Sequence, residues 1–304
     1  MKNFSPLMLL LVVFGSGCGD NLETPAPVVT FGPPLNPKAL SVNQSTISVQ
    51  WSASINATDS TFQGYIVQRG NSRDTLGKSQ LAYVADNLPS GESAFFIYSL
   101  RNDGFRSDAA TIRWAPAMRF DSVYEVYENV SLVSVRPEAF NVGTSTTDPS
   151  VLVMDPNDPA VQQTMDLFFN GDSLETQQSL SIWSANLLIG SFNTTFFSSH
   201  TDASPSLDFP LSTFPAENTF VQDSITFVDN TIYYLKVIGD PLQVNYARIH
   251  VHIKAGTIYP NRIIQVHVSL QRTAGLLYAA DSQDQSEGAV HRLSLFSPFF
   301  LNHS

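Results

Sequence analysis

Short runs in which apolar and polar residues alternate are the feature that most limits how this chain can fold. Ile47, Val49 and Trp51 alternate with Ser48 and Gln50, which is the period of a β-strand with one buried face and one wet face. Similar runs recur along most of the 304 residues, separated by turn-forming residues, and no heptads rich in Glu, Lys and Ala occur. The pattern predicts an all-β protein.

Length and charge set further limits. A chain of 304 residues is long enough for two domains that each bury a core. The net charge is −11 and the 16 Lys and Arg residues are scattered, which argues against a nucleic-acid partner because phosphate binding needs a basic face. An acidic surface also repels anionic headgroups, so we expect any membrane attachment to be covalent.

The first 18 residues supply such an attachment. Lys2 is followed by an apolar run at residues 7–14 and by small residues at 15–17, and Cys18 is the only cysteine. This segment resembles the lipobox of bacterial lipoproteins, although Gly15 stands where that family usually has Leu. The resemblance implies a cleaved signal peptide, a lipidated Cys18 and a place in the cell envelope, at the outer membrane or the cell surface. The alternative is an ordinary signal peptide with an incidental cysteine.

A polar, flexible linker is expected at residues 19–27 and a first β sandwich at residues 28–116. This second segment resembles a fibronectin type III domain in five places: Pro33-Pro34, Leu40, Trp51, Gly64-Tyr65-Ile66-Val67 and Asn102-Asp103-Gly104. It departs from that family at the tyrosine corner, where Phe95 or Phe96 stands in place of Tyr. The resemblance implies a spacer or a protein-binding platform. Strand alternation predicts these residues on the core face: Tyr65, Val67, Phe96, Tyr98 and Leu100.

Residues 117–280 are predicted to form a second antiparallel β domain, either a sandwich or a barrel, before a polar tail at 281–304 that ends in an apolar segment. Strands are expected at residues 123–127, 132–135, 151–154, 165–169, 180–192, 232–238, 246–253 and 263–270. Two long interruptions, residues 144–160 and 198–218, are predicted loops. We expect a binding surface on one of them, since long loops are usually functional or disordered.

Histidines on two predicted strands are candidates for a ligand site. The alternation in residues 246–253 places His250 and His252 opposite the apolar face, and His267 faces outward in the same way in residues 263–270. If these strands pair as a hairpin, three imidazoles share one sheet face, close enough for a metal or a haem iron. His200 is a fourth candidate. The alternative is that all four are ordinary polar residues without a ligand.

Two further motifs have weaker functional interpretations. Residues 171–174, Gly-Asp-Ser-Leu, match the nucleophile block of an esterase family, in which Ser173 would be the nucleophile. The sequence lacks the Asp-x-x-His and Gly-x-Asn-Asp blocks of that family, so a hairpin turn at Asn170-Gly171 is favoured. Residues 155–159 offer oxygens to calcium, but Asx turns explain them as well.

A fainter resemblance concerns the second domain. The segments at residues 165–169, 231–237 and 246–251 are similar to blocks of the HmuY-type haem-binding lipoproteins, with Met165 where an aromatic residue is usual. That resemblance implies an all-β surface lipoprotein that holds haem between two histidines. The segments do not show which histidines those would be.

Together these features predict an exported surface lipoprotein with a non-enzymatic binding or adhesion role. The fibronectin-like domain would act as spacer or platform, and the partner would be a protein or a polysaccharide. One alternative is capture of haem or a transition metal by the second domain. Another is a secreted hydrolase, because catalytic carboxylates leave no sequence signature. No residue is assigned a catalytic role.

Overall fold

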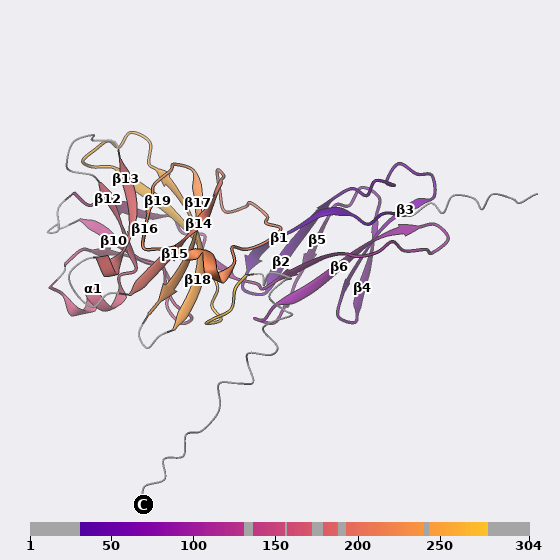
Figure 1. Cartoon of the computed structure of the whole chain (residues 1–304), viewed down its shortest axis with the longest axis horizontal. Helices are drawn as coiled ribbons and strands as arrows, with labels where there is room; N and C mark the ends of the chain where they lie inside the picture. The colour runs from indigo at the N-terminus through magenta and orange to yellow at the C-terminus, as the bar shows by residue number, and fades with distance from the viewer. Residues whose placement is uncertain are drawn as a thin grey trace, which may run out of the picture. The chain divides into compact units, whose positions relative to one another are not determined.

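The computed structural model describes residues 31–130, 136–155, 157–171, 179–187, 193–239 and 243–278 (Figure 1). The predicted signal peptide with Cys18, the linker, Ser173 and the tail at 281–304 lie outside the described residues. Within them the chain is all-β, as predicted, with one short helix, α1 (Pro159–Thr164), and two 3-10 turns, η1 (Ala185–Leu187) and η2 (Glu217–Thr219).

The first seven strands form two antiparallel sheets, which we call the first sandwich. Three strands pair in the order β1-β2-β5 and four in the order β4-β3-β6-β7. The bounds are β1 (Leu35–Asn43), β2 (Thr46–Ser52), β3 (Phe62–Arg69), β4 (Ser72–Gly77), β5 (Ala82–Ala85), β6 (Ser93–Arg101) and β7 (Ala110–Trp114).

Alternation predicted the core face of β2 and β3, but not of β6. Ile47, Val49 and Trp51 are buried as expected, and so are Tyr65 and Val67. On β6 the prediction was wrong for two residues out of three: Phe95 and Ile97 are fully buried, whereas Phe96 and Tyr98 are half-buried, and only Leu100 is buried as expected. The physical reason is that β6 carries large apolar residues on both faces, so its pattern does not define an inner face.

The remaining strands form a second sandwich of two antiparallel sheets. One has the order β11-β10-β12-β13-β16, and the other has the order β15-β14-β17-β18-β19-β8, with β9 also paired to β19. The bounds are β8 (Met118–Arg119), β9 (Tyr124–Tyr127), β10 (Pro137–Asn141), β11 (Ser150–Val153), β12 (Leu167–Gly171), β13 (Leu180–Ser184), β14 (Thr194–Ala203), β15 (Phe220–Gln222), β16 (Ser224–Thr226), β17 (Thr231–Ile238), β18 (Val244–Ile253) and β19 (Ile263–Leu270). Of the two predicted architectures, the described strands form the sandwich.

Several elements of the second sandwich were not predicted. Strand β10 buries Glu138 and Asn141 beside Phe140, so it shows no alternation of apolar and polar residues. Strand β14 reads as polar in its second half, Ser-Ser-His-Thr-Asp, although it pairs with β17 along its length. Helix α1 occupies part of the first predicted loop, where Asp158 accepts a hydrogen bond from the Ala160 N–H as its N-cap.

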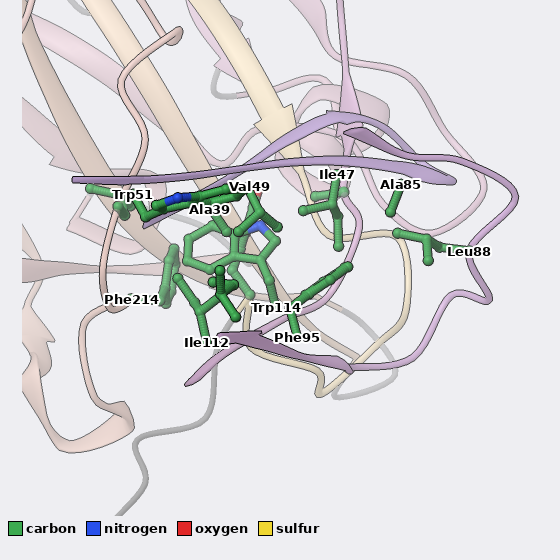
Figure 2. Packing of buried hydrophobic residues seen from close by; sticks show 14 of the residues in the cluster. Ala39, Ile47, Val49, Trp51, Ala85, Leu88, Phe95, Ile112, Trp114 and Phe214 are labelled. Atoms are coloured by element: carbon green, nitrogen blue, oxygen red, sulfur yellow. The ribbon is translucent and has the colours of Figure 1, made fainter. Parts of the chain in front are cut away.

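The second predicted loop, residues 198–218, is not a free loop, and that prediction was wrong. Its first part belongs to β14, and its later part buries Leu207, Leu211 and Phe214 in the cluster that holds the core of the first sandwich. Figure 2 labels Phe214 among side chains of β1, β2 and β7. Backbone hydrogen bonds run both ways between Ala39 and Leu211, at 2.7 and 2.9 Å. Apolar residues at wide spacing in a Pro-rich segment gave no periodic signal of this packing.

Candidate functional site

A cavity of about 290 Å³ lies at one end of the second sandwich. Residues at the ends of β10 and β11 form one side, and Gly239 after β17 with Gln243 and Asn245 at the start of β18 form the other. Nine of the twelve lining residues carry an amide or a hydroxyl side chain, and Leu152 is the only one with an aliphatic side chain. The first predicted loop, residues 144–160, contributes Thr144, Thr147 and Asp148 to the wall.

The charge at this cavity is already neutralised. Among the described lining residues only Asp148 is ionisable, and its carboxylate forms an ion pair with Arg272. Arg272 also donates to the carbonyl of Ser145 at 3.3 Å, and the Gln243 side chain donates to the Ser145 hydroxyl at 2.7 Å. These bonds hold the loop against the start of β18 and the segment after β19, and they leave no free charge among the described lining residues.

Three asparagines of the lining differ in how their amides are used. Asn141 donates to the carbonyl of Thr164 and accepts from the Gly143 N–H, so both of its ends are occupied. Asn193 donates to Asp166 Oδ1 at 2.7 Å. Asn245 is only 1% exposed, and its Oδ1 has no hydrogen-bond partner. A buried acceptor without a donor costs about 1–3 kcal/mol, and this atom is closed to solvent.

Asp166 lies directly behind Asn193 and is itself fully buried. Burial raises the pKa of its carboxyl to about 7, and the hydrogen bonds from Asn193 and from the Val142 N–H offset this only in part. A carboxyl in this range changes its protonation state near neutral pH. It is separated from the cavity by Asn193, so its role is to position that amide.

The predicted histidine pair is a second candidate site. Strands β18 and β19 pair as expected, His250 lies opposite His267, and the two ring centres are 5.6 Å apart. The face is not a solvent face, however, because His250 is only 3% exposed. The segment after β14 covers it, and the sequence carried no signal for that packing.

The tautomer of His250 follows from its one hydrogen bond. Its Nε2 lies 2.9 Å from the carbonyl oxygen of Ser204, and a carbonyl can only accept, so Nε2 carries the proton. Nδ1 then holds the lone pair, and it has no partner. Burial lowers the pKa of both His250 and His267, and Arg119 lowers that of His267 further. Both imidazoles are therefore neutral near pH 7, the form that binds metals.

The other two candidate histidines have partners of their own. His252 Nδ1 lies 3.0 Å from Asp229 Oδ1. His200, two strands away on β14, stacks on Tyr234 and lies 3.4 Å from Asp202. The structure thus brings His250 and His267 together and leaves His200 apart. Within the described part of the chain, no three His, Cys, Asp or Glu residues gather as a metal-holding group.

The hairpin turn predicted at Asn170-Gly171 is wrong, because both residues belong to β12 and pair with Ser181 and Leu180. The Asp-rich motif has a structural explanation. Asp155 accepts from the Asn157 N–H at 2.9 Å and Asp158 from the Ala160 N–H at 2.8 Å. These are the Asx turns and the helix cap expected of such residues. Both carboxylates therefore serve the backbone.

Comparisons with known proteins add no assignment: no family model matches the chain, and no curated protein matches it. In the described residues, no helix has the length and apolar character needed to cross a membrane. The amide cavity was missed by sequence reasoning because Asn141, Asn193 and Asn245 lie far apart in the chain. The length of the first predicted loop was the only local signal of it.

Proposed function

We propose that this chain is a non-enzymatic binding protein of the bacterial cell surface. The observation that supports this best is the cavity at the end of the second sandwich, with its lining of uncharged amides and hydroxyls. General acid–base or nucleophilic catalysis requires a titratable or activated group at the substrate. The only carboxylate in this lining, Asp148, is paired with Arg272, so the lining suits binding better than bond cleavage.

The remaining parts of the chain have supporting roles in this proposal. Cys18 carries the lipid anchor, and the first sandwich acts as a spacer or platform. Its division into three and four strands supports the resemblance to a fibronectin type III domain. The proposal places the protein at the outer membrane or the cell surface.

The anchor and the binding role are tested separately. Cell fractionation of the Cys18→Ala variant should move the protein from the membrane fraction to the soluble fraction, while the wild-type chain stays with the membrane. If both proteins remain in the membrane, Cys18 is not the anchor.

The binding role is tested by thermal unfolding of the full chain with a panel of sugars, peptides and small polar molecules. A ligand that binds only the native state raises the unfolding temperature. Chromatography should then recover the ligand unchanged. Recovery of a cleaved product would replace the binding role with a hydrolase, and a panel without any response would reject the proposal.

A second candidate function, capture of a transition metal, is favoured by the His250–His267 pair. A metal-binding imidazole usually donates its other N–H to a carbonyl or carboxylate, which fixes the ring, and His250 does so toward Ser204. Arg119 repels a cation at His267, but its charge is offset by the ion pair with Asp208. A ring separation of 5.6 Å suits a bare ion such as Cu²⁺ or Zn²⁺ better than haem, because a porphyrin would have to fit between the rings.

Calorimetric titration of the full chain with Cu²⁺ and with Zn²⁺ tests this second function. One equivalent should bind to the wild-type chain and to His200→Gln, whereas His267→Gln should lose most of the affinity. Equal binding by all three proteins would place the metal elsewhere. A parallel titration with hemin distinguishes haem from the bare ion.

A further inference from the structure

We infer that the cavity at the end of the second sandwich binds neutral carbohydrate, one or two sugar units at the end of a glycan. This inference rests on the proposed binding function and names its ligand class. The first argument is hydrogen-bond chemistry. Amide and hydroxyl side chains both donate and accept, and nine of the twelve lining residues are of these kinds. Sugar hydroxyls also do both, so they can pair with lining groups that are not already bonded within the protein.

The second argument is charge. The ion pair between Asp148 and Arg272 leaves neither charge free to attract an ionic ligand. No Lys, Arg or His belongs to the lining among the described residues. Phosphate and carboxylate ligands need such cations or a helix N-terminus. The cavity therefore favours neutral sugars over acidic ones.

The third argument is size and shape. Ligand cavities commonly measure about 300–1,000 Å³, and a cavity of about 290 Å³ is at the small end of that range. Peptide recognition uses an open strand edge or apolar side-chain pockets, and Leu152 is the only aliphatic side chain here. Together with the methyl and methylene groups of Thr and Gln, Leu152 provides surface for the C–H groups of one sugar ring.

The fourth argument is the Oδ1 atom of Asn245. It is a buried acceptor without a donor in a wall where Asn141 is fully bonded. This atom is closed to solvent in the structure, so a sugar hydroxyl can donate to it only after the Asn245 side chain turns toward the cavity. That bond would remove an unsatisfied polar group from the interior.

The test is a glycan array of neutral and acidic glycans, probed with the full-length chain in detergent, followed by titration of the best neutral glycan. Gln163→Ala and Thr147→Ala change exposed lining residues. The Thr147 hydroxyl also bonds to Thr144, so Gln163→Ala is the variant that leaves the bonds within the loop intact. Each should weaken binding about fivefold, the effect of one lost hydrogen bond. Ser150→Trp should fill the cavity and abolish binding, and Asn245→Leu should weaken it about tenfold or more. Gln222→Ala, exposed on β15 and outside the lining, is the matched control and should bind as the wild type does.

Unfolding temperatures of all variants identify any that are misfolded. Equal binding by the wild type and the Gln163→Ala, Thr147→Ala and Ser150→Trp variants would overturn the inference, because another surface would then hold the glycan. If no neutral glycan binds but the thermal panel shows a peptide or an ionic ligand, the carbohydrate inference fails and the binding function stands. If neither the array nor the panel shows any ligand, both fail.

Discussion

The two sandwiches bury different kinds of polar group. In the first sandwich the buried polar residues are all Ser or Thr, for example Ser41, which accepts a hydrogen bond from the indole N–H of Trp114 at 2.9 Å. Among its described residues, the second sandwich buries six acidic or basic side chains: Glu128, Glu138, Asp166, Arg248, His250 and Arg262. Both are antiparallel β structures with apolar interiors, so the fold class does not require this difference.

The difference indicates where binding chemistry is located. Burying a charge costs several kcal/mol unless it is paired and hydrogen-bonded. A spacer has no functional reason to bury charged side chains. Around the end cavity and the histidine pair, buried polar groups fix other side chains: Asp166 holds Asn193, and the Ser204 carbonyl holds His250. This difference is consistent with the proposed function, in which the first sandwich is a spacer or platform and the second binds the ligand.

The largest effect is expected from breaking the buried ion pair of the second sandwich. Arg262 Nε donates to Glu128 Oε2 at 2.7 Å, and Glu128 is fully buried. Arg262→Ala leaves that carboxylate unpaired, so we expect a loss of about 3–5 kcal/mol in the free energy of unfolding. Denaturant unfolding measures it. The exposed pair Lys254–Glu125 is the control, and Lys254→Ala should cost less than about 1 kcal/mol. Similar values for both variants would contradict the comparison.

The next effect tests whether the two sandwiches depend on one shared core. Phe214 belongs to the segment after β14, yet it packs in the first core cluster and stacks on Tyr278 with ring centres 4.7 Å apart. Phe214→Ala should lower the free energy of unfolding by about 3 kcal/mol or more, in one transition seen by every probe. Phe105→Ala, at a half-exposed site, should change it by about 0.5 kcal/mol or less. Two separate transitions would show independent cores.

Asp166 should make stability fall as the pH rises. Its pKa in the folded chain, about 7, lies above its ordinary value of 3.8, so the native state binds the proton more tightly than the unfolded state does. The stabilisation that protonated Asp166 contributes is complete below pH 3.8 and is lost as the pH rises through about 7. The free energy of unfolding falls by on the order of 4 kcal/mol over this range. Asp166→Asn should flatten this dependence in unfolding curves measured across the range. An unchanged slope would mean that Asp166 is ionised in the native state.

The smallest expected effect has the opposite sign and comes from the histidine pair. Burial lowers the pKa of His250 below its ordinary value of 6.5, so its contribution is present above 6.5 and lost as the pH falls toward the folded-state pKa. His250→Gln should reduce the loss of stability on acidification, by less than the change at Asp166. His200→Gln, at an exposed position, is the control. If the free energy of unfolding changes with pH in the same way in wild type and His250→Gln, protonation of His250 does not destabilise the folded chain.

The sequence predicted the strands better than it predicted the candidate site. Alternation in residues such as Ile47, Val49 and Trp51 predicted part of the first sandwich. The shared sheet face of His250 and His267 was predicted on the condition that their strands pair, which they do. The inner face of β6, strands β10 and β14, and the burial of His250 were missed. In each of these cases side chains from another part of the chain cover a strand face. The local pattern predicted that face to be exposed, or it did not distinguish the two faces.

The sequence by itself determined the all-β class, because a period of two residues is a property of the local chain and needs no partner. Only the tertiary structure decided which surfaces are exposed and where the cavity lies. Asn141, Asn193 and Asn245 meet there from separate strands, and Leu207, Leu211 and Phe214 cover the core of the first sandwich. Such contacts depend on how sheets and loops pack over long sequence distances, and no short-range periodicity records that packing.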